Sequence, residues 1–176
     1  AQRKHFPSLN WLLSYSKYLR PLDPWYETNW PQFPPMRTTV KEILQVEDDL
    51  TEIVQLVGKD SLAESDKLIL EVAKILRDDY LAQNGFSDWD KTCPFYKSVW
   101  LMKNIVDFYN LSRKAIEGST AENKITWNRL KAHMPDTIYK LSTQKFQLPT
   151  DGEAACTAHF QGLNDEIVTA FRSLED

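Results

Sequence analysis

The chain has 176 residues, 42% of them apolar and 26% charged, a mixture typical of a soluble globular protein with one domain, or one domain and a short appendage. Its net charge of -4 argues against a general nucleic-acid binder, and no stretch has the roughly 18 apolar residues of a membrane-spanning helix. Two cysteines, Cys93 and Cys156, are too few for a disulfide scaffold and predict a reducing, cytosolic location.

The first 35 residues have an unusual start and are rich in proline and tryptophan. The opening AQRKHFPS begins without methionine, which fits either the middle of a longer polypeptide or removal of an initiator methionine before Ala1. Residues 11–35 then contain five prolines and three tryptophans. Because proline lacks a backbone N–H and clashes inside helices, we expect short helical turns and extended links here.

A long helix is predicted next, over residues 36–57. Apolar residues recur there at helical spacing, and Gly58 supplies a C-terminal stop. Immediately afterwards, Ser61 and Glu64 have the spacing of a capping box, in which each side chain satisfies a free amide at a helix start. We therefore expect a second helix to begin at this pair.

The second and third predicted helices flank a polar loop. Apolar residues continue at helical spacing to Tyr80, and Asn84-Gly85 is expected to end the second helix in a left-handed cap. The loop FSDWDKT leads to Pro94, which suits the first turn of a helix because its missing N–H costs nothing there. The third helix is expected to close near Gly118.

The remaining sequence predicts two more helical stretches. One runs from Ile125 to Leu141 and should be kinked or split at Pro135, and the last contains residues 160–174 and is entered through Thr150 or Asp151. No segment shows convincing alternation of period two. The fold class is therefore all-α, an irregular bundle of five or six helices joined by short loops.

No complete active site is recognisable in the sequence. His5, His133 and His159 lack the spacing of metal ligands, so we assign no metal site. There is no GxSxG elbow, no Walker A motif and no GxGxxG, and adjacent carboxylates such as Asp48-Asp49 point in different directions on a helix. Because catalysis needs several groups held together, we assign no catalytic residue.

Several stretches nevertheless resemble the catalytic A subunit of vacuolar-type proton ATPases. They are AQRKHFPSLNWLLSYSKY, EIVQLVGKDSLAESDK, LAQNGFSDWDKTCPFYK, NKITW, DGEA and FRSLED, in the same order. The resemblance covers essentially the whole chain. It implies that residues 1–20 are the tail end of the nucleotide-binding domain and residues 21–176 are the C-terminal helical domain. The phosphate-binding lysine and the glutamate that positions water would belong to an upstream portion, so the chain alone should not hydrolyse ATP.

The resemblance also implies an aromatic wall on the adenine side of an ATP site. Phe6 and Phe95 match the positions that flank the adenine, and Trp89 and Cys93 match neighbouring pocket positions. Trp89 stands where the family has tyrosine or phenylalanine. Stacking of an aromatic ring on a base contributes about 1–3 kcal/mol. From the residues alone, the favoured interpretation of Trp89 and Phe95 is as core anchors of a helix start, because most aromatic residues belong to the core.

Two further roles follow from the resemblance. Cys93 would be redox-regulatory, forming an inactivating disulfide with a cysteine of the phosphate-binding loop, whereas a buried inert thiol is the alternative. The stretch KDSLAESDK matches the position of the DELSEED motif, which contacts the rotating central stalk. The rotor-contact residues would be Asp60, Ser61, Leu62, Glu64, Ser65 and Asp66, although a solvated helix start fits them too.

As a whole, the resemblance implies a protein that couples ATP hydrolysis to rotation of the central stalk (the D and F subunits) for proton transport. Its partners would be the B subunit and the hetero-oligomeric ring of A and B subunits (A3B3), with Mg-ATP as the nucleotide. It would be a cytoplasmic, peripheral component of the V1 sector on vacuolar or other endomembranes, without nucleic-acid binding or direct membrane insertion. The alternative is a free-standing helical module for protein–protein interaction that binds no nucleotide.

Overall fold

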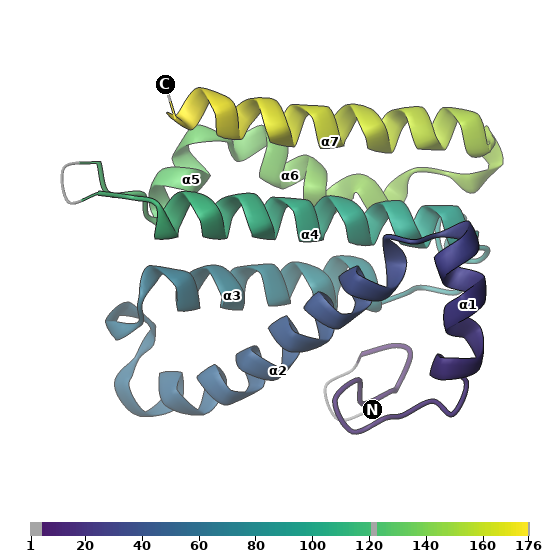
Figure 1. The fold of residues 1–176 in the computed structure, drawn as a ribbon, viewed down its shortest axis with the longest axis horizontal. Coiled ribbons are helices and arrows are strands. Elements are labelled where there is room, and N and C mark those ends of the chain that lie inside the picture. Colours follow the sequence, from purple (N-terminus) through teal and green to yellow (C-terminus); the bar gives the residue numbers. More distant parts are fainter. Residues whose placement is uncertain (1–4, 121–122, 176) are drawn as a thin grey trace.

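The computed structural model describes residues 5–120 and 123–175 and is all-α, as predicted (Figure 1). The described part contains seven α-helices, one more than the upper limit expected from the sequence. The additional helix is α1 (Leu19–Asn29), which lies in the proline-rich region where only short turns were expected. Pro21 lies in its first turn, where a missing N–H removes no intrahelical hydrogen bond. Pro24 lies in its interior, where it removes one backbone hydrogen bond without preventing the helix.

Helix α2 (Phe33–Val57) confirms the first predicted helix and begins three residues earlier than expected. Pro34 and Pro35 occupy its first turn, where a missing N–H leaves no intrahelical bond unmade. Gly58 ends it with φ +82° and ψ 159°, a conformation that is open essentially to glycine alone, and its N–H donates to the Val54 carbonyl oxygen at 2.9 Å. The predicted C-terminal stop is therefore confirmed.

The predicted capping box at the start of the second helix is wrong. Ser61 lies in a 3₁₀ turn (Lys59–Ser61), and its hydroxyl donates to the carbonyl oxygens of Val57 at 3.2 Å and Gly58 at 2.9 Å. Helix α3 (Glu64–Ile75) begins three residues later. The Glu64 carboxylate instead accepts a hydrogen bond from the backbone N–H of Trp127 at 2.9 Å. This N–H is an orphan donor at the start of helix α5 (Trp127–His133).

The left-handed cap predicted at Asn84-Gly85 is also absent. Helix α3 passes at Ile75 into a π-helical segment, Leu76–Leu81, which ends when Ala82 turns to an extended conformation. Positive φ angles occur only at Gly58 and Gly152 among the described glycines, so Gly85 makes no such cap. A loop then runs to Pro94, directly before α4 (Phe95–Glu117), which ends at Gly118 as predicted.

The second half of the chain folds back along one side of α4 (Figure 1). Helices α5 (Trp127–His133) and α6 (Pro135–Thr143) confirm the split at Pro135. Two 3₁₀ turns, Gln144–Phe146 and Pro149–Asp151, lead to α7 (Glu153–Glu175), which begins later than predicted because Gly152 turns the chain with φ +91°. In Figure 1, α4 and α7 run side by side, and α5 and α6 form the path between them.

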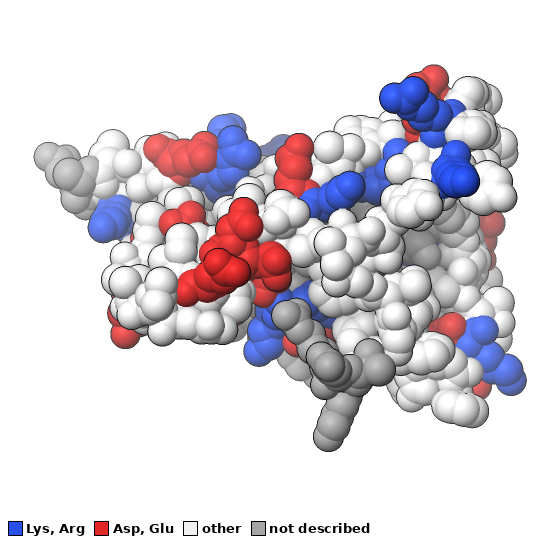
Figure 2. Space-filling view, turned by 90° about the horizontal axis from the view of Figure 1, so that it is seen from below, with Lys and Arg blue, Asp and Glu red and all other residues white. Residues whose placement is uncertain are grey.

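One continuous core joins these elements. It contains apolar residues of α2, α3, α4, α5 and α7, among them the fully buried Leu68, Val72, Phe108, Leu130 and Ile167. Helix α1 packs at one end of the long axis, and the α2–α3 turn lies at the opposite end (Figure 1). Figure 2 shows acidic side chains gathered on the face seen from below, the side on which α2 lies.

Candidate functional site

The N-terminal segment lies against the loop that precedes α4. The Nε2 atom of His5 is 3.1 Å from the carbonyl oxygen of Arg77, and the backbone N–H of Gln83 donates to the carbonyl oxygen of Phe6 at 2.8 Å. The rings of His5 and Trp11 meet edge to face, with centroids 5.1 Å apart. These contacts bring the segment predicted to end the nucleotide-binding domain next to the segment that carries Trp89 and Cys93.

A cavity of about 310 Å³ opens where these segments meet. Cys93 lines it, whereas Phe6 does not: the Phe6 side chain is 61% exposed and is not part of the lining. Burial raises the pKa of the Tyr80 phenol, another lining group, above its ordinary value, so it remains protonated. The lining residues are His5, Pro7, Leu9, Trp11, Ser14, Tyr80, Leu81, Gln83, Asp90, Cys93, Ser98 and Leu101.

The two cysteines have different surroundings, and both are free thiols. Cys93 is half-buried, with Sγ 3.4 Å from the hydroxyl of Ser98. Cys156 is fully buried at the start of α7, and its thiol donates to the carbonyl oxygen of Leu148 at 3.2 Å. Burial and a hydrogen bond with Cys156 raise the pKa of Tyr96 to about 12. Cys93 therefore faces a cavity and Cys156 faces the core.

Phe95 is the centre of an aromatic cluster. As the first residue of α4 it is half-buried, and its ring lies 5.9 Å from Trp25, 5.7 Å from Tyr26, 5.7 Å from Trp30 and 5.0 Å from Phe33, centroid to centroid. These geometries, tilted or edge to face, are the favourable ones for aromatic pairs. Phe95 thus anchors α1 and the start of α2 to α4. Its predicted contact with adenine stays a prediction.

Trp89 belongs to a second ring pair on the same loop. Its ring packs edge to face against Phe146, with centroids 5.1 Å apart and an interplanar angle of 87°. The backbone carbonyl of Trp89 accepts a hydrogen bond from the ammonium of Lys97, a wholly buried side chain of α4. Lys97 was not among the residues predicted from the sequence. Its position, four residues before the buried Leu101 and seven before the buried Asn104, is the signal that places it on the core face.

The predicted rotor-contact residues are brought together at the opposite end of the molecule, in the turn between α2 and α3 (Figure 1). Asp60 and Ser61 are exposed, and Leu62, Glu64, Ser65 and Asp66 are half-buried. Glu64 forms an ion pair with Lys67 at 2.9 Å. That hydrogen bond, together with the backbone N–H of Trp127, holds the pKa of Glu64 below its ordinary value of 4.5 although burial opposes the shift.

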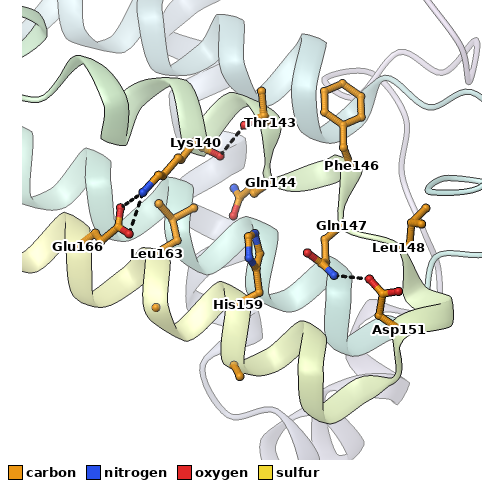
Figure 3. Close-up of a pocket in the computed structure, with 12 residues that line it drawn as sticks. Lys140, Thr143, Gln144, Phe146, Gln147, Leu148, Asp151, His159, Leu163 and Glu166 are labelled. Atoms are coloured by element: carbon orange, nitrogen blue, oxygen red, sulfur yellow. Dashed lines mark hydrogen bonds and ion pairs between the residues drawn. The ribbon is translucent and has the colours of Figure 1, made fainter.

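A larger groove of about 720 Å³ lies between α6, the 3₁₀ turns and α7 (Figure 3). At one end Lys140 and Glu166 form an ion pair at 2.7 Å, and at the other Gln147 donates to Asp151 at 2.7 Å. Figure 3 shows His159 between these two pairs. The four polar groups are thus engaged with one another inside the groove.

Neither a group of metal ligands nor a membrane-spanning helix is found in the described ranges, 5–120 and 123–175. In those residues no three His, Cys, Asp or Glu side chains are grouped so that they could hold a metal ion. Within the same ranges, every helix is too short or too polar to cross a membrane.

Comparisons with known proteins identify the family. The family model described as the C-terminal domain of V and A type ATP synthase matches residues 22–125. Over its full length the chain is 59% identical to the catalytic A subunit of the V-type proton ATPase of Dictyostelium discoideum. It is 58% identical to the corresponding protein of Manduca sexta and 57% identical to isoform 2 of Drosophila melanogaster. The chain spans only 28% of the length of the Dictyostelium relative and 29% of the other two.

These matches cover the family-model region and the rest of the chain alike, so they confirm the resemblance deduced from the quoted stretches. They do not favour the free-standing interaction module. The chain therefore belongs to the family of the C-terminal domain of V and A type ATP synthases and matches the C-terminal part of the catalytic A subunit of V-type proton ATPases.

Proposed function

We propose that the chain is the part of a proton-pumping ATPase catalytic subunit that borders the adenine of ATP and couples hydrolysis to rotation. The observation that carries this proposal is the identity of 57–59% over the whole chain with V-type proton ATPase catalytic subunits. Because the chain spans less than a third of those relatives, ATP hydrolysis belongs to the whole subunit, which supplies the phosphate- and magnesium-binding groups.

The adenine side is assigned to the end of the molecule that carries Phe6, Trp89, Cys93 and Phe95. The cavity of about 310 Å³ is near the lower limit of known ligand pockets, a size suited to a base rather than to a whole nucleotide. Its lining is largely apolar, which favours a flat ring system. Phe6 does not line the cavity, but its chain neighbours His5 and Pro7 do, and its exposed ring is available to stack on a base bound at the cavity mouth.

The opposite end is assigned to the rotor. The six rotor-contact residues named above form one turn at the far end of the molecule from the adenine side, and helices α2 and α3 connect the two ends (Figure 1). A tilt of the bundle that follows nucleotide binding would therefore displace this turn. The D and F subunits of the stalk would be its contacts, the B subunit would complete the ring, and the vacuolar or endomembrane surface would be the site of assembly.

Replacement of Phe6 by alanine tests the adenine contact in the intact complex. Loss of one stacked ring should weaken ATP binding roughly 5- to 150-fold, equivalent to about 1–3 kcal/mol. Thermal stability should not change, because the ring is 61% exposed. Tyr139→Ala, which removes an aromatic ring that is 70% exposed on α6, is the matched control and should leave ATP affinity unchanged. Equal affinities for the Phe6 variant and the unmodified complex would remove this role.

A further inference from the structure

Lys97 has an environment that is unusual for a lysine. Its side chain is completely buried, and its ammonium donates to three backbone carbonyl oxygens, those of Trp89 at 2.7 Å, Lys145 at 2.7 Å and Gln147 at 2.9 Å. An ammonium has three donors, so all of them are used. Lys97 forms no ion pair within the described residues, and the three backbone carbonyl oxygens are its direct hydrogen-bond partners.

The three carbonyls belong to two segments far apart in the sequence. Trp89 lies in the loop between the π-helical segment and α4, whereas Lys145 and Gln147 flank Phe146 in the turn that follows α6. The ring of Phe146 is the one that packs against the Trp89 ring. One ammonium therefore fixes the backbone on both sides of a ring-to-ring contact.

A second lysine extends the connection. The ammonium of Lys145 donates to the carbonyl oxygens of Asp78 at 3.3 Å and Ala82 at 3.4 Å, at the end of the π-helical segment. The loop of residues 82–94 is thus held at its beginning by Lys145 and near its middle by Lys97. Burial lowers the pKa of Lys97 below its ordinary value, as expected for a charge removed from water.

We propose that Lys97 is the positioning residue of the loop of residues 82–94, holding Trp89, and with it Cys93, in place at the adenine end. Lys97 itself does not line the cavity, so it acts only through the backbone that it binds. The consequence for nucleotide binding rests on the proposed function; the consequence for the loop does not.

The chemical accessibility of Cys93 is a direct readout of the position of this loop. In the intact complex without nucleotide, Lys97→Met removes the ammonium and keeps a side chain of similar length. Alkylation would be followed for each cysteine-containing peptide by mass spectrometry. We expect Cys93 to react at least about tenfold faster, because local opening is no longer opposed by three charge-assisted hydrogen bonds. Cys156 is fully buried in the core and should be accelerated much less than Cys93.

Lys91→Met is the matched control variant, because it makes the same change at an exposed lysine of the same loop and should leave Cys93 reactivity unchanged. Unchanged reactivity of Cys93 in Lys97→Met would overturn the proposal. An equal acceleration of Cys93 and Cys156 would also overturn it, because Lys97 would then support the whole fold rather than the loop. If Lys97→Met does not assemble, Lys97→Gln decides by the same criterion, with an increase of at least about threefold expected.

The KM for ATP separates this inference from the proposed function. If the loop borders the nucleotide, Lys97→Met should raise KM while kcat is retained. Faster alkylation of Cys93 with an unchanged KM would support the positioning of the loop by Lys97 and count against the adenine assignment. The two ideas can therefore fail independently.

Discussion

Truncation of Phe95 should destabilise the fold, because this ring holds α1 and the start of α2 to α4. Its four aromatic neighbours lie with centroids 5.0–5.9 Å away, and replacement by alanine would leave a gap between them. Replacement by leucine would keep most of the apolar surface and remove only the ring-to-ring contacts. The two variants together separate burial from aromatic packing.

The expected magnitudes follow from these contacts. Truncating a core phenylalanine to alanine costs about 3–5 kcal/mol, and the half-buried position of Phe95 favours the lower end, about 3 kcal/mol. Each aromatic pair contributes about 0.5–1.5 kcal/mol beyond its buried area, but the four pairs share one ring and do not add. We therefore expect Phe95→Leu to cost about 1–2 kcal/mol of the free energy of unfolding.

Urea-induced unfolding measures both values, and the fluorescence of Trp25 and Trp30 reports the local environment because these rings contact Phe95. A loss below about 1 kcal/mol for Phe95→Ala would refute the anchoring role. In the intact complex, a loss of ATP affinity by Phe95→Leu without a comparable loss of stability would show that the ring also serves the nucleotide.

Two further predictions concern buried hydrogen bonds. Asn104→Leu should cost about 2–4 kcal/mol in the same unfolding assay, because the fully buried amide donates to the side-chain oxygen of Gln144 and accepts from the amide of Asn164, and its loss removes both hydrogen bonds. Ser112→Ala removes a buried hydroxyl with no partner in the described residues and should cost far less; equal costs would contradict this reasoning. Glu64→Gln should be less stable than the unmodified chain at pH 7 by roughly 1 kcal/mol, and the difference should shrink as the pH falls below 4.5. The reason is that a carboxylate whose pKa is lower in the folded state contributes stability above its unfolded pKa and loses it on protonation. A pH-independent difference in unfolding free energy would contradict the assignment.

The positions of most helices follow from local signals that the sequence contains. Apolar spacing and Gly58 predicted the end of α2, and Pro135 predicted the break between α5 and α6, because both residues act through their own backbone. Helix α1 was missed for a complementary reason. Its prolines argued against a helix locally, whereas Tyr26 packs against Phe33 and Phe95 and stabilises it through tertiary contacts.

The errors at α3 have the same origin. Ser61 and Glu64 have capping-box spacing, but Glu64 finds a partner 63 residues away, at the first N–H of α5. No rule based on near neighbours can anticipate a bond over such a separation. At the candidate site, the sequence indicated the residues of the loop, whereas the contacts that hold it, from Lys97 to two distant segments, emerge only from the fold.

The bond between Glu64 and the start of α5 has a mechanical consequence. It ties the outermost turn of the domain to the chain beyond α4 through a single contact of 2.9 Å. A force applied at that turn would be transmitted to the second half of the polypeptide through this hydrogen bond as well as through the packed side chains of the core. The Glu64 carboxylate thus contributes to the stiffness of this extremity, and acidification that protonates it would soften the turn.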